Sequence, residues 1–429
     1  MINNSRSPFF KITLFLYRLV MHLPIWATKF IAGKSKFSRS IQGRKNWESE
    51  WRSRIDPLRQ TGGNKLVWMH AASLGEFEQG SPVLRALRKA YPEMKIVATF
   101  FSPSGYEIRK NTPLADATGY LPWDNPGNAR QILDLLRPDL IIWVKYDYWF
   151  YFLREINQRQ IPLLLISAIF RKEQPFFQWY GEFHRQMLEY FTRIFVQNER
   201  SREKISSFIG ANNIEIAGDT RFDTVLEMLK ESVTLPYLQL PDRLNQPVLI
   251  AGSTWPGDEI LLKEFIEIMP EFKMIIAPHE IDEKHLLGIE KLFSGKRYSQ
   301  INSCADAGSR VIIIDSIGKL KYLYPYGHYA YIGGGFNKSG IHNTLEAAAY
   351  GKPVLFGPNY QKFAEAVSLI KNGAAFSVKN GEELAEKIRS LSLGSNAYSN
   401  AAMRAEQFVK ENAGATEAIM QYIRENVFD

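Results

Sequence analysis

The sequence predicts an α/β protein made of two Rossmann-like domains whose parallel sheets face a cleft. The first observation is length, because 429 residues exceed what one ordinary hydrophobic core holds together. The second is an alternation of short apolar runs with charged helical segments, which is the rhythm of βαβ units. The third is that this rhythm stops at a polar stretch with prolines, residues 236–247, and then starts again. We therefore expect one sheet on each side of a linker, with ligands at the carboxyl ends of the strands.

The first 47 residues are expected to form a membrane-anchoring segment. They contain nine Lys and Arg residues and no Asp or Glu. Residues 9–31 are rich in Phe, Leu, Ile, Trp and Tyr, but basic residues interrupt the run before it reaches the roughly 20 residues that cross a bilayer. Basic residues spaced along an apolar helix favour an interfacial helix on an anionic membrane surface. The alternative is an ordinary amphipathic helix that packs on the protein.

The apolar runs place the strands of both domains. In the first domain, residues 48–235, strands are expected at 66–71, 96–101, 140–144, 163–167 and 194–197. In the second domain, residues 248–410, strands are expected at 248–252, 274–278, 311–315, 330–333 and 353–356. Residues 411–429 have a helical pattern and are expected to form a C-terminal helix.

Composition and charge exclude several classes of protein. Apolar residues make up 45% and aromatic residues 13%, which is typical of a globular chain. The net charge of +8 comes from the first 47 residues, so the rest of the chain lacks the basic footprint of a nucleic-acid-binding protein. Cys304 is the only cysteine, so no intramolecular disulfide can form. The histidines show no metal-ligand spacing, and we expect no metal and no cofactor.

The stretch 331–358, YIGGGFNKSGIHNTLEAAAYGKPVLFGP, predicts a strand, a glycine-rich loop, a short helix and a second strand. Glycines such as Gly334 and Gly335 let a backbone approach a ligand closely. A helix near 343–350 would point free N–H groups at a phosphate, and Glu346 could accept hydrogen bonds from a ribose. The pattern favours a nucleotide pocket, with a purely structural turn as the alternative.

Glu76 is the candidate general base. It lies in HAASLGEFE, between an expected strand and an expected helix, and so at the rim of the predicted cleft. The helix dipole would lower the pKa of its carboxyl and burial would raise it, so the sequence leaves the balance open. The alternative is a helix-capping acid, and Glu78 is the nearby rival for the base.

Charged residues follow other expected strands of the first domain. Lys145, in WVKYDYW, could balance a leaving phosphate or a substrate carboxylate, with a strand-end salt bridge as the alternative. Arg221, in GDTRFD, offers a fork for carboxylate or phosphate, with helix capping by Asp219 or Asp223 as the alternative. Arg171 and Lys172 would suit an acidic acceptor or a solvated loop.

Strand ends of the second domain face the same predicted rim. Ser253 and Thr254 lie in GSTWPGDE, and His279 lies in APHE. The segment DSIGK, residues 315–319, also follows a strand. Each segment alone is typical of a turn, but together with the glycine-rich loop they favour a binding site.

These motifs resemble the 3-deoxy-D-manno-octulosonic acid (Kdo) transferases of Gram-negative bacteria. The similarity rests on HAASLGE, AGSTWPGDE, GGGFNKSGIHNTLEAAAYGKPVLFGP and the basic, apolar N-terminus. The resemblance implies GT-B architecture and inverting transfer of Kdo from CMP-Kdo to a lipid A precursor (lipid IVA). It also implies work at the cytoplasmic face of the inner membrane, without a metal.

The resemblance also implies roles for individual residues. It makes Glu76 the catalytic base and Lys145 and Arg221 the transition-state stabilisers. The implied cytidine-nucleotide contacts are Pro278, His279, Ile317, Gly318, Lys319, Asn343, Thr344, Leu345 and Glu346. Many members carry ETELW where this chain has residues 145–149, lysine in place of Arg221 and arginine in place of His279, so the charge at Lys145 is reversed.

Two other functions stay open on the sequence alone. One is a different membrane-associated GT-B enzyme that uses a UDP-sugar and a lipid-linked acceptor. The other is a catalytically idle, membrane-bound binding module, which would tolerate the loss of Glu76.

Overall fold

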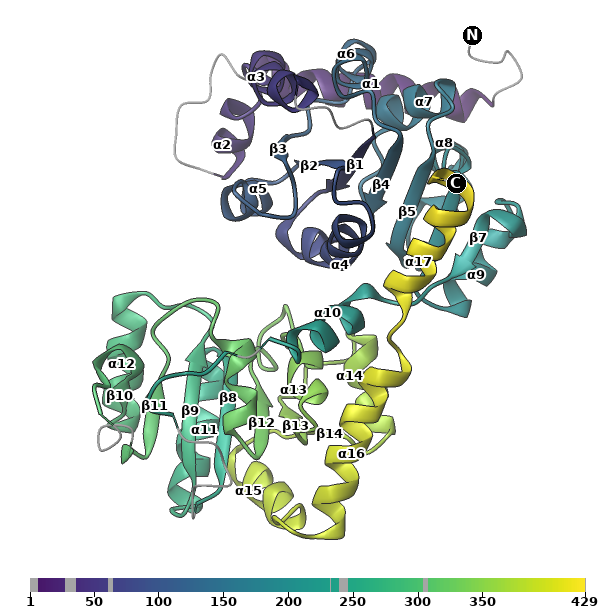
Figure 1. Cartoon of the computed structure of the whole chain (residues 1–429). Helices are drawn as coiled ribbons and strands as arrows, with labels where there is room; N and C mark the ends of the chain where they lie inside the picture. The colour runs from purple at the N-terminus through teal and green to yellow at the C-terminus, as the bar shows by residue number, and fades with distance from the viewer. Residues whose placement is uncertain are drawn as a thin grey trace. The chain divides into compact units, whose positions relative to one another are not determined.

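The computed structural model describes residues 7–27, 36–60, 65–231, 233–238, 246–303 and 308–428. The chain forms two compact units, Met1–Thr224 with Gly414–Asp429, and Val225–Ala413 (Figure 1). The division therefore lies before the predicted linker 236–247, part of which is outside the described residues. The end of the chain, predicted as a separate helix, belongs to the first unit.

The first unit contains a seven-stranded parallel sheet. Its strands, in spatial order, are β3 (Ala117–Tyr120), β2 (Lys95–Phe100), β1 (Leu66–Ala71), β4 (Leu140–Val144), β5 (Leu163–Ala168), β6 (Arg193–Val196) and β7 (Ile214–Ile216). Its helices are α1 (Pro8–Ala27), α2 (Lys36–Gln42), α3 (Trp47–Gln60), α4 (Leu74–Ala90), α5 (Pro103–Arg109), α6 (Pro126–Leu136), α7 (Phe150–Gln158), α8 (Glu182–Glu189), α9 (Glu199–Ser206) and α17 (Ala415–Ile423). Helix α10 (Thr220–Met228) crosses the division between the units.

The second unit also contains a seven-stranded parallel sheet. Its strands, in spatial order, are β10 (Lys296–Arg297), β11 (Val311–Ile313), β9 (Lys273–Pro278), β8 (Val248–Thr254), β12 (Tyr329–Ile332), β13 (Val354–Phe356) and β14 (Ala375–Ser377). Its helices are α11 (Pro256–Ile268), α12 (Glu283–Phe293), α13 (Leu345–Ala349), α14 (Ala364–Lys371), α15 (Gly381–Ser390) and α16 (Asn396–Glu411). The predicted α/β class with two parallel sheets is confirmed.

Both faces of the first sheet are buried, because side chains of a strand alternate between faces and helices cover both. Trp68 and Trp143 point into the core on one face, and Met69 and Ile142 into the core on the other. Helix α17 lies beside α4 (Figure 1). It adds apolar side chains, including Ile419, to the core that contains Met69 and Ile142. This burial explains why the end of the chain joins the first unit.

Helix α1 is apolar on two sides, and the protein covers only one of them. Phe10 and Leu14 are buried against the first unit, and Tyr17 donates a hydrogen bond to buried Asp124. Burial raises the pKa of Asp124 to about 6. The outward side chains, each half or more exposed, are Phe9, Ile12, Phe15, Leu16, Leu19 and Val20. In the described ranges no helix is both long enough and apolar enough to cross a membrane.

Arg44 is part of the folded first unit. Its guanidinium is buried and donates hydrogen bonds to the carbonyls of Ser40, Phe101 and Leu121. This position differs from the prediction, which counted Arg44 among the charges of a membrane anchor covering residues 1–47. Residues 28–35 of that segment lie outside the described residues.

Candidate active site

Glu76 lies in the first turn of α4, directly after β1. Its Oε2 accepts hydrogen bonds from the backbone N–H of Ser73 at 2.8 Å and from the Ser73 hydroxyl at 3.0 Å. The carboxylate therefore caps the helix, as the structural alternative proposed, and also stands at the carboxyl edge of the sheet. Both bonds use Oε2, so Oε1 is the oxygen that could take a proton from a substrate.

Burial decides the direction of the pKa shift of Glu76, which the sequence left open. It raises the pKa of this carboxyl, and the nearby charge of Asp147 raises it further. The bonds from Ser73 and the charge of Lys145 act in the opposite direction but do not cancel the rise. A carboxyl with a raised pKa is a stronger base near neutral pH.

The rival base, Glu78, is neutralised by a partner. Its Oε1 accepts from Nε of Arg109 at 2.8 Å and from Nη2 at 2.6 Å. A carboxylate oxygen held by two N–H groups of an arginine is already occupied by that partner. Glu76 is the better candidate.

The loop after β4 brings three polar side chains to the same edge. Lys145 has a positive φ of 60°, and its Nζ lies 5.5 Å from the centre of the Tyr146 ring. Because the charges of Lys145 and Asp147 both shift the pKa of Glu76, this loop lies close to the candidate base. A positive φ in a lysine is strained, and such strain concentrates at functional sites.

Arg221 is held in place by a carboxylate. Its Nε and Nη2 lie 2.9 and 2.8 Å from Oδ2 of Asp219, which is buried. Asp219 also accepts from the Arg221 backbone N–H at 3.0 Å, as the capping alternative proposed. The contact with Asp219 therefore fixes the orientation of the Arg221 guanidinium.

Tyr146 lies among these charges, and the sequence reasoning missed it. Burial raises the pKa of its phenol, Arg171 and Arg221 lower it, and Asp219 and Glu76 raise it. Its neighbours thus include the candidate base and two arginines. The sequence signal that could have identified Tyr146 was its position in WVKYDYW, immediately after Lys145.

In the second unit, the glycine-rich loop is fixed by backbone packing. The N–H of Gly333 donates to the carbonyl of Gly252 and that of Gly334 to Oδ2 of buried Asp258, each at 2.8 Å. A Cβ on Gly333 would lie 2.2 Å from the carbonyl oxygen of Ser253, and one on Gly335 would lie 2.5 Å from Gly357. The N–H of Gly334 is therefore already bonded within the protein.

The segment after this loop differs in length from the prediction. Helix α13 starts at Leu345 and has five residues, where a helix near 343–350 was expected. Its dipole is correspondingly small, so a weaker attraction for an anion is expected than from the longer predicted helix. Asn343 accepts from the N–H of Leu345 at 3.0 Å and donates to Oε1 of Glu346 at 3.1 Å. Burial raises the pKa of Glu346, against the Asn343 bond and the charge of Lys321.

Thr344 is the most suggestive polar group in this segment. It is fully buried, and its Oγ1 meets no hydrogen-bond partner within the described parts of the chain. Thr254 differs, since its hydroxyl donates to Oε1 of Glu259 at 3.0 Å, and it is buried too. Thr344 is therefore a better ligand candidate than Thr254. Ser253 is half-buried and has a positive φ of 55°.

A stack of three rings forms where β8 and β9 end. His279, which follows Pro278, stacks on Trp255 at 4.8 Å and on His342 at 4.3 Å between ring centres. Nε1 of Trp255 donates to Nε2 of His342 at 3.0 Å. Burial, aided by His279, lowers the pKa of His342 to about 4, so His342 is neutral at pH 7. The sequence reasoning found His279 but missed both of its supports.

The third nucleotide segment is a turn. Ile317 is 87% exposed, Gly318 has a φ of +85° that favours glycine, and Nζ of Lys319 lies 4.6 Å from the centre of the Tyr298 ring. The exposed Ile317 side chain is unusual for an apolar residue and leaves this turn open to a ligand.

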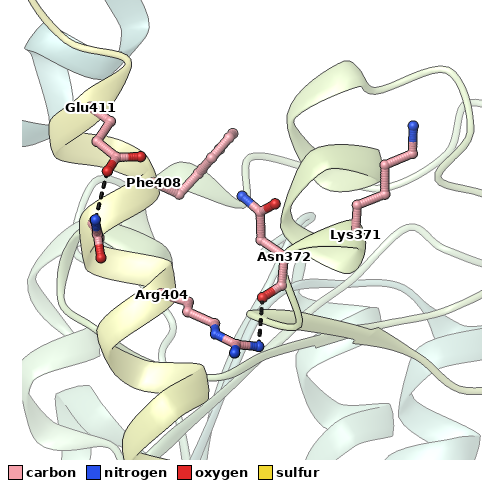
Figure 2. A pocket seen from close by; sticks show the side chains of 6 residues that line it. Lys371, Asn372, Arg404, Phe408 and Glu411 are labelled. Atoms are coloured by element: carbon pink, nitrogen blue, oxygen red, sulfur yellow. Dashed lines mark hydrogen bonds between the residues drawn. The ribbon is translucent and has the colours of Figure 1, made fainter.

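A pocket in the second unit, shown in Figure 2, has a volume of about 400 Å³. The residues that line it are Lys371, Asn372, Arg404, Gln407, Phe408 and Glu411. It contains none of the predicted site residues. In the described ranges no three His, Cys, Asp or Glu side chains gather in a way that could hold a metal ion.

The two parallel-sheet α/β units have a GT-B-like architecture. Solved structures with this fold include UDP-GlcNAc 2-epimerase from Neisseria meningitidis (TM-score 0.58, 18% identity, 84% of this chain and 100% of that one). A glycosyltransferase from Rickettsia africae is also similar (TM-score 0.53, 14% identity, 85% and 100%). At these identities the likeness concerns the fold alone.

More particularly, the chain is similar to the Kdo transferases. A family model described as 3-deoxy-D-manno-octulosonic-acid transferase (kdotransferase) matches residues 49–224. Curated 3-deoxy-D-manno-octulosonic acid transferases are similar over most of the chain. That of Aquifex aeolicus is 29% identical over 332 residues, which cover 76% of this chain and 85% of the relative. That of Rickettsia felis is 29% identical over 385 residues, covering 86% and 80%.

Proposed function

We propose that this chain transfers Kdo from CMP-Kdo to a lipid A precursor of the lipid IVA type, with inversion at the anomeric carbon. The observation that carries the proposal is Glu76, a carboxyl of raised pKa at the edge of the sheet, whose capping hydrogen bonds both use Oε2 and not Oε1. The similarity to Kdo transferases supports this choice of sugar.

In the proposed reaction, Glu76 takes the proton from a sugar hydroxyl of the acceptor. The hydroxyl oxygen forms a bond to the anomeric carbon of Kdo while the bond from that carbon to the CMP phosphate breaks. Arg221, oriented by Asp219, and Lys145 offset negative charge on the substrates. Such fixed cations supply charge stabilisation through the residues of the chain itself, and the proposal uses no metal or cofactor.

The proposed donor contacts lie in the second unit. Glu346 takes the ribose hydroxyls, and the unpartnered hydroxyl of Thr344 takes a polar atom of the nucleotide. His279, held by Trp255 and His342, donates to the phosphate. Pro278, Ile317, Gly318, Lys319, Asn343 and Leu345 shape the remaining surface, with Ser253 and Gly335 at its border.

The proposed location is the cytoplasmic face of the inner membrane, with the outward side of α1 lying in an anionic membrane surface. Six exposed apolar side chains line this side, and exposed Lys11 and Arg18 border it. Trp179, which is 75% exposed, contacts Phe9 with ring centres 4.9 Å apart and extends the same surface. Apolar side chains bordered by cations suit an interfacial helix.

The membrane proposal predicts the effect of removing three outward side chains. We expect Ile12→Ser, Leu16→Ser and Leu19→Ser together to lower partitioning onto phosphatidylglycerol-containing vesicles about 100-fold, at roughly 1 kcal/mol for each half-inserted side chain. Vesicle co-sedimentation measures this.

The matched control replaces equally exposed apolar residues of the second unit, Ile260→Ser, Leu287→Ser and Met403→Ser. This control should partition like the wild type. Unchanged partitioning of the α1 variant would refute the proposed contact.

A transfer assay tests the function directly. We expect the purified chain, given CMP-Kdo and a tetraacylated lipid A precursor, to add the mass of one or more Kdo units, read by mass spectrometry. Parallel reactions contain UDP-sugars with the same acceptor. Transfer from a UDP-sugar and not from CMP-Kdo would favour the alternative enzyme, and no transfer at all beside an active control enzyme would refute the proposed reaction.

A further inference from the structure

A buried histidine lies in the strand that precedes the candidate base and has no role in the reaction as described so far. His70 is the fifth residue of β1 and is fully buried. Its Nε2 lies 3.6 Å from Oδ2 of Asp147, in the loop after β4. Neither of these two buried atoms has a hydrogen-bond partner within the described residues. An unpaired buried polar atom is unfavourable, so a small closing movement that joins the two is favourable.

The other side of the imidazole is already fixed. Nδ1 of His70 lies 2.9 Å from Oγ1 of Thr99, and this oxygen accepts from Nε1 of Trp68 at 2.8 Å. Burial lowers the pKa of His70, so the ring is neutral and carries one N–H. A carboxylate faces Nε2, so the N–H is most stable there, and Nδ1 then accepts the proton of the Thr99 hydroxyl. The ring is thus oriented with its donor toward Asp147.

Asp147 is also tied from its backbone. Its carbonyl accepts from Nε1 of Trp143, whose ring centre lies 4.3 Å from that of His70. One side of the Asp147 side chain therefore faces His70, while its charge reaches Glu76. His70 therefore contacts the Asp147 carboxylate, and the charge of that carboxylate acts on the candidate base, Glu76.

We propose that His70 is a positioning residue that holds the Asp147 carboxylate beside Glu76, so that the base faces a second negative charge when it takes the acceptor proton. The inference rests on the proposed role of Glu76. A neighbouring carboxylate makes proton uptake by Glu76 easier, because the proton relieves the repulsion between the two.

The other groups around the pair are charged or titratable and enter the same balance. Arg44 acts on both His70 and Asp147, and Lys145 and Tyr146 act with Glu76. A substitution at His70 leaves all of these groups in place. A change in the pH profile after that substitution therefore reports on the orientation of Asp147.

The test compares two replacements of His70 in the full chain. Gln places an N–H donor near the position of the histidine Nε2, whereas Met has similar length and no donor. We expect His70→Met to lower kcat at least tenfold with little change in KM, and to move the acid limb of kcat/KM down by about one pH unit. Asp147→Asn should give the same shift, and His70→Gln should keep the wild-type acid limb.

Matched measurements separate positioning from folding. His184→Met, which changes another histidine of the first unit, should leave the profile unchanged. Equal losses in His70→Met and His70→Gln with an unmoved acid limb would overturn the inference, since that pattern is structural. If His70→Met does not fold, Asp147→Asn decides, because that side chain is 23% exposed. An inactive Glu76→Gln beside an unmoved limb in Asp147→Asn would overturn this inference alone, whereas an active Glu76→Gln would remove the base and the inference with it.

Discussion

We expect Glu76→Gln to lower kcat for Kdo transfer about 10²- to 10⁴-fold, because an amide cannot take the proton of the attacking hydroxyl. The substitution is nearly isosteric, and the amide oxygen can still accept from Ser73 at the start of α4. The fold and donor binding should therefore survive. The measurements are initial rates of transfer and calorimetric binding of CMP.

The pH profile of the wild type gives a second reading of the same residue. Burial raises the pKa of Glu76, so the carboxyl becomes protonated, and useless as a base, at a higher pH than an ordinary glutamate. We therefore expect kcat/KM to fall with decreasing pH along a limb that lies above the usual glutamate range. The control is Glu78→Gln, two residues further along the same helix, where the carboxylate pairs with Arg109. This variant should keep the wild-type acid limb. Wild-type turnover by Glu76→Gln would show that another group is the base.

The strands that the sequence predicted well are those buried on both faces. β1 and β4 have the predicted bounds, because every residue of each is buried and the apolar runs are continuous. The short strands β3, β10 and β14 were missed. β3 reads ATGY, and its Gly119 is needed because a Cβ there would lie 2.5 Å from the Trp51 ring. That requirement comes from a helix about 70 residues earlier and leaves no local signal.

The site was predicted where chemistry follows a strand directly, as at Glu76. It was not predicted where two distant segments share a bond. Asp258 resembles a surface acid at a helix start, yet it is buried and accepts from the N–H of Gly334 at 2.8 Å and from Tyr331 at 2.9 Å. Only the pairing of β8 with β12 brings these residues together. For the same reason the sequence could not show that the loop N–H was already in use.

We expect Arg44→Met to lower the free energy of unfolding of the first unit by at least about 3 kcal/mol. The carbonyl oxygens of Ser40, Phe101 and Leu121 lose their donor, at about 1–3 kcal/mol for each of the two buried bonds, to Ser40 and Leu121, and less for the part-buried bond to Phe101. The guanidinium also lies 4.5–4.9 Å from the centres of the rings of Phe101, Tyr120 and Trp123, and these contacts are lost. Burial lowers the pKa of Arg44 to about 9, which still leaves it charged at pH 7. Urea unfolding followed by tryptophan fluorescence measures the loss.

Arg39→Met is the matched control, because it removes a nearby arginine, in helix α2, which ends just before Arg44. Arg39 pairs with Glu107 on the surface, with side chains 44% and 40% exposed, and such pairs contribute less than about 1 kcal/mol. Arg44→Lys keeps the charge but not the planar fork, so its loss should fall between the other two. Equal stability of the Arg44 and Arg39 variants would mean that residues 36–47 do not hold the first unit together. A selective loss at Arg44 would show that this segment stabilises the first unit, unlike the proposed membrane-facing side of α1. It would also link the segment to the candidate site, because the Phe101 ring that Arg44 contacts lies 4.5 Å from the Trp149 ring between centres.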